Sequence, residues 1–171
     1  MTSSRLAYAL LAIDPGHVSG WAIVVRGRLS LSGKATSESA RRYAVALAVR
    51  TAAEEGLPLV VVGETWGPGG LRTGIYHAML DQWREWKREL SRAGIGRDAI
   101  VRYDSREWHE VLEPYPRHAD FHALTIAHAR KWVGGGARIG DDEADAIGIA
   151  SYAVGRPEIE RLAAELARTA A

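Results

Sequence analysis

The order of the apolar runs along the chain restricts its fold more than any other feature. Three runs come first, at residues 6–14, 20–25 and 28–33, and Gly27 provides a tight turn between the second and the third. This pattern is typical of strands joined as an antiparallel meander. Two further strand-like runs, at 59–64 and 99–105, then alternate with helical segments. Because such alternation adds strands in parallel, we predict an α/β fold with a mixed five-stranded sheet and helices on both faces.

The helices are predicted from apolar residues that recur every three or four positions. The first begins at Ser37 or Ser39 and ends at about Glu55. Asp141 is suited to cap a later helix at 142–154. The other helical segments are 73–92, 106–112 (one or two turns), 117–132 and the stretch from 157 onward.

Size and composition are those of a globular protein. The chain has 171 residues, of which 47% are hydrophobic and 25% charged, and it is expected to form one domain over residues 1–171 that ends in a helix at 155–171. No run of about 18 apolar residues occurs, so no membrane-spanning helix is expected. The chain has no cysteine, which excludes disulfides, thiolate metal sites and cysteine nucleophiles. A cytoplasmic protein is the default expectation.

Carboxylates stand at comparable places in the predicted sheet. Asp14 ends the first strand and Glu64 ends the fourth, so both would emerge at the same edge if these strands are neighbours. Asp142 and Asp145 are three residues apart on a helix and therefore project from one face of it. Each residue alone has an ordinary explanation, as a turn residue, a strand-end charge or part of an acidic first turn. Together they predict one acidic cluster.

Such a cluster requires cations, because carboxylates held close together repel one another and their pKa values rise. With oxygen ligands only, the suitable ions are Mg²⁺ or Mn²⁺. Two such ions about 4 Å apart, bridged by one carboxylate, form a known arrangement for the in-line hydrolysis of a phosphodiester. The sequence therefore predicts a two-metal nuclease site at this edge of the sheet.

Three motifs of the chain resemble those of the RuvC-like Holliday junction resolvases of the RNase H-like superfamily, nearer to their phage branch. AIDPGHVSGWAIV resembles the family's strand–DPG–strand motif with its Ser/Thr-Gly pair, here Ser19-Gly20. VVGETW resembles the strand with the catalytic glutamate, and DDEADAIGIA resembles the helical Asp-x-x-Asp-Ala motif. The resemblance extends from Ala9 to about Val154.

This resemblance implies an activity and a site. The catalytic metal ligands would be Asp14, Glu64, Asp142 and Asp145. Asp14 would bridge two Mg²⁺ or Mn²⁺ ions. The implied activity is metal-dependent cleavage of four-way or other branched DNA by a homodimer that makes paired symmetrical nicks. The implied location is the cytoplasm of a bacterium or of a phage-infected cell.

The chain departs from the bacterial members of this family at three points. The loop from Asp14 to Ser19 is one residue shorter and lacks their arginine. Where they place a functional lysine after the fifth strand, this chain has His109, either a weaker phosphate contact or an ordinary surface histidine. Trp66 is the nearest counterpart of their aromatic wedge, and it either stacks on a base or forms a hydrophobic latch on the protein itself.

Basic residues, most of them in the N-terminal part, supply candidate phosphate contacts. Residues 1–50 contain seven Lys or Arg against two Asp or Glu, whereas the whole chain has a net charge of +1. A polyanion could bind such a surface, although a charge run is often only a solvated face. The candidates for nucleic-acid contact are Arg26, Arg28, Lys34, Arg41, Arg42 and Arg72, together with Trp66 and His109.

The helix at 73–92 carries one continuous apolar stripe, formed by Ile75, Met79, Trp83, Trp86 and Leu90. Core packing and a subunit interface both explain such a stripe. Resolution of a junction needs two cuts related by two-fold symmetry, which a C₂ dimer provides. We therefore predict a homodimer formed through residues 75–90.

Other functions known for this superfamily remain for comparison. Sugar kinases and actin relatives need two such domains and a second phosphate loop, for which 171 residues leave no room. A catalytically dead scaffold would be expected to lack one of the carboxylates, and all four are present. A nuclease of broader specificity, acting on branched DNA, flaps, RNA–DNA hybrids or structured RNA, stays open, because junction selectivity comes from dimer geometry and DNA shape.

Overall fold

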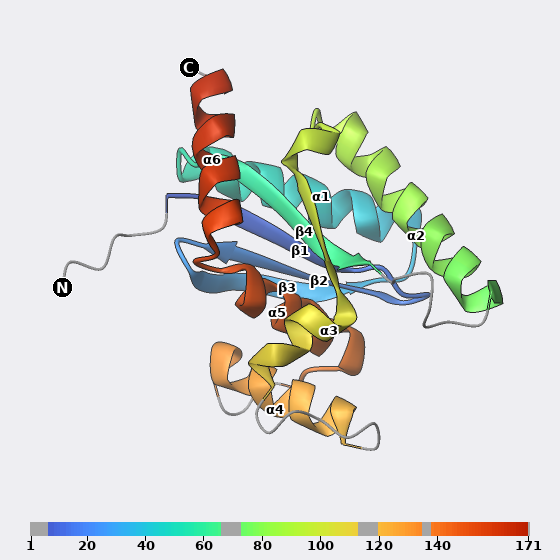
Figure 1. Ribbon diagram of the computed structural model, residues 1–171. Coiled ribbons are helices and arrows are strands. Elements are labelled where there is room, and N and C mark those ends of the chain that lie inside the picture. Colours follow the sequence, from blue (N-terminus) through green and yellow to red (C-terminus); the bar gives the residue numbers. More distant parts are fainter. Residues whose placement is uncertain (1–6, 66–72, 113–119, 135–137, 171) are drawn as a thin grey trace.

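The computed structural model describes residues 7–65, 73–112, 120–134 and 138–170 and has a five-stranded sheet at its centre (Figure 1). The strands are β1 (Ala9–Asp14), β2 (Ser19–Val25), β3 (Arg28–Ala35), β4 (Leu59–Thr65) and β5 (Ile100–Asp104). Their order is β3-β2-β1-β4-β5. β1, β2 and β3 pair as an antiparallel meander, whereas β4 pairs in parallel with both β1 and β5. The mixed sheet predicted from the sequence is therefore confirmed.

Helices cover both faces of this sheet, as predicted (Figure 1). The helices are α1 (Glu38–Glu54), α2 (Thr73–Arg92), α3 (Ser105–Trp108), α4 (Phe121–Val133), α5 (Asp141–Ala153) and α6 (Pro157–Ala170), with 3₁₀ turns at Arg97–Ala99 and His109–Val111. α1 and α2 enclose one core with Leu11 and Ile13 of β1. α4, α5 and α6 enclose the other, to which β1 contributes Leu10 and Ala12. Among the described residues, no helix is both long and apolar enough to cross a membrane.

The turn between β2 and β3 follows from its two residues. Arg26 and Gly27 have φ angles of 52° and 76°, both in the left-handed region. Val25 and Arg28 on either side are paired, so the loop has the two left-handed residues that a type I′ hairpin requires. The tight turn predicted at Gly27 is therefore confirmed, with Arg26 sharing its backbone conformation.

Several element boundaries differ from the prediction. α5 begins at Asp141 with Gly140 as its N-cap, so Asp141 is not the capping residue. The Lys34 side chain lies against this N-cap glycine. α4 is described from Phe121, and the Leu124 N–H donates to the Asp120 carbonyl in its first turn, whereas the predicted start at residue 117 lies outside the described residues.

The apolar stripe of α2 belongs mainly to the core of a single chain. Trp83 is 3% exposed, and Trp86 and Leu90 are fully buried against the sheet and α1. The predicted dimer interface is therefore wrong for these three residues, because the face of the sheet that α2 covers takes up their side chains. Met79 is half-buried, and the side chain of Ile75 lies outside the described residues.

Candidate active site

The register of the sheet places Asp14 and Glu64 side by side. β1 and β4 run in parallel with Ile13 opposite Gly63, so the two acidic residues that follow are neighbours. Both lie at the carboxyl ends of their strands, the edge at which α/β sheets bind ligands. The sequence-based prediction that these two strands are adjacent is confirmed by the strand order.

α5 brings Asp142 and Asp145 to the same edge. This helix packs across β1 and β2. Its first turn lies directly on Gly20, which is paired with Asp14, and a Cβ atom at Gly20 would overlap with the Asp142 carbonyl oxygen. Only glycine therefore lets the start of α5 approach β2 this closely. The four predicted carboxylates meet at one site, from two parallel strands and one helix.

Burial and mutual repulsion raise the pKa values of three of these carboxyl groups. Burial, followed by repulsion from Glu64 and Asp142, raises the pKa of Asp14 well above its ordinary range. Burial and the charge of Asp145 raise the pKa of Glu64 to about 8. The nearby Trp108 indole N–H partly offsets this rise. Burial, with repulsion from Asp14 and Asp142, raises the pKa of Asp145 to about 8.

The chemistry of these side chains fits a hard divalent cation. All four donors are carboxylates, and Asp145 Oδ1 is buried without any hydrogen-bond partner. A bound cation would satisfy this oxygen and relieve the repulsion that raises the pKa values. In the conformation seen, no three His, Asp or Glu side chains of the described residues are arranged closely enough to hold a metal ion.

Lys34 stands at the rim of this carboxylate site. It lies on β3 opposite Gly20, and its Nζ donates a hydrogen bond of 2.9 Å to Asp142 Oδ2. This bond raises the pKa of Lys34 above its ordinary value. Two residues earlier, Ser32 donates a 2.6 Å hydrogen bond to Glu143. Of the predicted phosphate contacts that the structure describes, Lys34 is thus the one whose side chain pairs with a site carboxylate.

Arg26 and Arg28, also predicted as phosphate contacts, lie at the end of the sheet opposite to the carboxylates. They flank the β2–β3 turn, and Val25 beside them pairs with Ala9 at the start of β1. Arg26 also forms an ion pair of 3.3 Å with Glu55. These arginines are distant from Asp14 because the turn lies beside the start of β1, whereas Asp14 is the last residue of that strand.

Arg41 and Arg42 are held between α1 and α2, which also differs from the prediction. Arg41 is only 9% exposed, and its Nη2 lies 3.9 Å from Glu85 Oε2. Arg42 donates hydrogen bonds to Glu38 at 2.6 Å and to Glu89 at 3.0 Å. The guanidinium groups of Arg41 and Arg42 thus pair with acidic side chains of these two helices. Arg41 is wrong as a phosphate contact, because it is buried.

His109 lies among aromatic rings and carries no charge near pH 7. Its ring is half-buried, and the centroid of this ring lies 4.3 Å from the ring centroid of Trp108 and 4.3 Å from that of Phe121. Burial lowers its pKa to about 4. His109 therefore cannot replace a lysine as a cation near pH 7. Two other predicted contacts, Trp66 and Arg72, lie outside the described residues.

Two tryptophans and a serine behind the carboxylates were not predicted from the sequence as part of the site. The Trp83 indole N–H donates a 2.6 Å hydrogen bond to the Glu64 carbonyl. The Trp86 indole N–H donates a 3.0 Å hydrogen bond to the Ser19 hydroxyl. These contacts could have been predicted from the rule that a buried indole N–H needs a hydrogen-bond acceptor, because the strand ends next to α2 supply acceptors.

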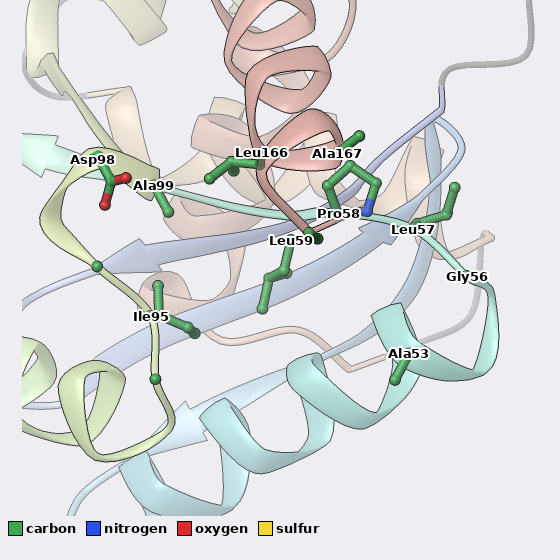
Figure 2. A pocket seen from close by; sticks show the side chains of 13 residues that line it. Ala53, Gly56, Leu57, Pro58, Leu59, Ile95, Asp98, Ala99, Leu166 and Ala167 are labelled. Carbon is green, nitrogen blue, oxygen red and sulfur yellow. The ribbon is translucent and has the colours of Figure 1, made fainter.

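A separate hollow of about 670 Å³ lies at the far end of the sheet (Figure 2). It is formed by the end of α1, the start of β4, the segment before β5 and the last turns of α6. Its lining is apolar except for backbone groups and Asp98. It contains none of the four carboxylates.

The fold and the site together define an α/β protein with an acidic centre at the carboxyl edge of its sheet, and solved structures with the same fold exist. Thermus thermophilus RuvC in complex with a Holliday junction substrate matches with a TM-score of 0.59 and 15% identity, over 85% of this chain and 91% of that chain. A second Thermus thermophilus RuvC structure matches with a TM-score of 0.58 and 16% identity, over 84% and 92%. The RNase H-like fold predicted from the sequence is confirmed by this likeness.

The yeast mitochondrial Holliday junction resolvase Ydc2 is less similar in structure. It matches with a TM-score of 0.45 and 14% identity, over 98% of this chain and 83% of that chain. No protein-family model matches the chain, and no curated protein matches it in sequence.

Proposed function

We propose that this chain is a metal-dependent, structure-selective endonuclease that resolves four-way DNA junctions. The observation that carries the proposal is the convergence of Asp14, Glu64, Asp142 and Asp145 at one edge of an RNase H-like sheet. The sequence resemblance to the RuvC-like resolvases, nearer to their phage branch, supports the same function. So does the likeness to a RuvC structure solved with a Holliday junction substrate.

The four carboxylates would hold two Mg²⁺ or Mn²⁺ ions, with Asp14 at the centre between Glu64 and the residues of α5. Such ions supply an activated water and stabilise the leaving 3′ oxygen, which yields 5′-phosphate and 3′-hydroxyl ends. Glu64 and Asp145, whose pKa values are raised to about 8, would hold such ions in their deprotonated form. Trp108 and the apolar core beneath keep water away from the buried side of these carboxyl groups.

Lys34 is the residue that we assign to the phosphate backbone of the DNA. Its ammonium group is next to Asp142, at the half-exposed rim of the site. A cation bound by Asp142 would compete with Lys34 for the same carboxylate. Lys34 would then be free to contact a phosphate group, which a point charge on a flexible side chain does well.

Paired nicks require two copies of the site, because one site cuts one strand at a time. A C₂ homodimer would place two sites with the symmetry of a four-way junction. Its interface does not include Trp83, Trp86 or Leu90, which are buried within one chain. The dimer is therefore proposed from the chemistry of the reaction.

The test of this function compares substrates. Purified protein with Mg²⁺ or Mn²⁺ is incubated with labelled four-way, three-way and linear duplex DNA and with an RNA–DNA hybrid, and its mass in solution is measured. We expect a dimer that cuts the four-way junction at least about ten times faster than linear duplex. A monomer that cuts all substrates at similar rates would instead support the broader nuclease.

A further inference from the structure

We propose that Trp86 and Trp83 are positioning residues of the carboxylate site, which set the spacing between Asp14 and Glu64 from one rigid helix. The inference rests on the function proposed above. It concerns side chains that touch neither substrate nor metal and act through the two strand ends that carry the ligands.

Trp86 is connected by hydrogen bonds to the turn that follows Asp14. Its N–H donates to the Ser19 hydroxyl at 3.0 Å, and that hydroxyl donates to the Gly16 carbonyl at 3.0 Å. The Gly16 N–H in turn donates to the Asp14 carbonyl at 3.0 Å. Trp86 and Ser19 are both fully buried, so no water competes for these bonds. One continuous chain of hydrogen bonds therefore connects α2 to the backbone of Asp14.

Trp83 is hydrogen-bonded directly to the end of β4. Its N–H donates to the backbone carbonyl of Glu64 at 2.6 Å. Its ring lies on Gly63, where a Cβ atom would overlap with the ring atoms. Gly63 is opposite Ile13 in β1, so the ring is seated beside both ligand-bearing strands.

These two hydrogen bonds matter more for the positions of the two strand ends than for the stability of the fold. Trp83 and Trp86 are three residues apart and lie on one face of α2, so the two strand ends are held by the same rigid element. A single neutral hydrogen bond adds little to the net stability of a fold. A displacement of about 1 Å in a reacting group, however, can lower the rate about 100-fold. The side chain of Leu90, on the same stripe, has no polar atom and contributes packing to the same core.

The experiment removes the indole N–H and keeps an aromatic ring at each position. Trp86→Phe and Trp83→Phe are compared with Trp132→Phe, a half-buried tryptophan on α4 that serves as the matched control. Measured quantities are the Mn²⁺ dissociation constant by calorimetry, kcat and KM on a four-way junction, and the melting temperature. For Trp86→Phe we expect Mn²⁺ binding weakened about 3–10-fold and kcat lowered about 10-fold, with KM within about 2-fold of wild type.

A second comparison tests the chain of hydrogen bonds itself. Ser19→Ala should lower kcat as Trp86→Phe does, and the double variant should lose no more than the larger single loss, because residues of one network are not additive. Independent, multiplicative losses would overturn the proposed chain.

The remaining outcomes are also decisive. Wild-type Mn²⁺ affinity and kcat in Trp86→Phe would overturn the proposal, and so would equal losses in Trp132→Phe. If the wild-type protein cuts no branched DNA while Trp86→Phe still binds Mn²⁺ more weakly, the positioning role stands and the nuclease function fails.

Discussion

At the scale of single residues, the carboxyl groups of Asp14, Glu64 and Asp145 are buried against one another with raised pKa values. A group whose folded pKa lies above its unfolded pKa stabilises the fold at low pH, and this contribution is lost as pH rises through the folded value. The metal-free protein should therefore lose stability between about pH 4.5 and pH 8. A bound cation should reverse this loss.

Glu64→Gln tests this linkage. Glutamine mimics the protonated carboxyl group and carries no charge, so it removes one source of repulsion. At pH 8 without metal, the unfolding free energy should rise on the order of 2 kcal/mol, or roughly 5 °C in melting temperature. At pH 5 the gain should nearly vanish, and Mn²⁺ should stabilise the variant less than wild type. Thermal melts at both pH values check this, and a melting temperature at pH 8 equal to or below wild type would contradict it.

Lys34→Met tests the assignment of the rim cation. Loss of the positive charge beside Asp142 should strengthen Mn²⁺ binding about 2–5-fold and weaken binding of four-way DNA about 3–10-fold. Arg28→Met, at the other end of the same strand, is the matched control and should change neither quantity. Calorimetry and a binding titration at two salt concentrations provide the measurements. If Lys34→Met and Arg28→Met behave alike, Lys34 has no special role.

At the scale of elements, the sequence predicted the meander, the alternation that follows and the strands that carry Asp14 and Glu64. These predictions succeeded because periodic burial depends on which residues are apolar, and this is visible in the sequence. The start of α5 was predicted one residue late, because a residue whose type suits a helix cap need not occupy the cap position. The polar contacts of Trp83 and Trp86 were not predicted, since periodicity reports burial and not hydrogen-bond partners.

Gly20→Ala tests how α5 is placed on the sheet. The added methyl group would overlap with the Asp142 backbone, so the start of α5 must shift. We expect a loss of about 1–3 kcal/mol in unfolding free energy and Mn²⁺ binding weakened at least about 5-fold. Gly96→Ala is the control, because there a Cβ atom meets only the flexible Asp98 side chain. Wild-type Mn²⁺ affinity in Gly20→Ala would show that α5 does not need this close approach.

At the scale of the whole molecule, the uneven charge of the sequence did not predict a basic surface at the site. Arg41 and Arg42 of α1 pair with Glu85 and Glu89 of α2, while Arg26 lies at the opposite end of the sheet. Counts of charge along a chain carry no information about such pairing across helices. The four carboxylates could be predicted because their positions follow from strand ends and helix spacing.

Cleavage of a labelled four-way junction by wild type and by Asp14→Asn tests whether these carboxylates form a metal-dependent nuclease site. We predict that wild type with Mg²⁺ cuts at symmetrical positions and leaves 5′-phosphate and 3′-hydroxyl ends. Asp14→Asn should bind the junction within about 2-fold of wild type and cut at least about 100-fold more slowly, because it lacks the shared ligand. Cleavage by Asp14→Asn at the wild-type rate, or by wild type in excess EDTA, would contradict the account.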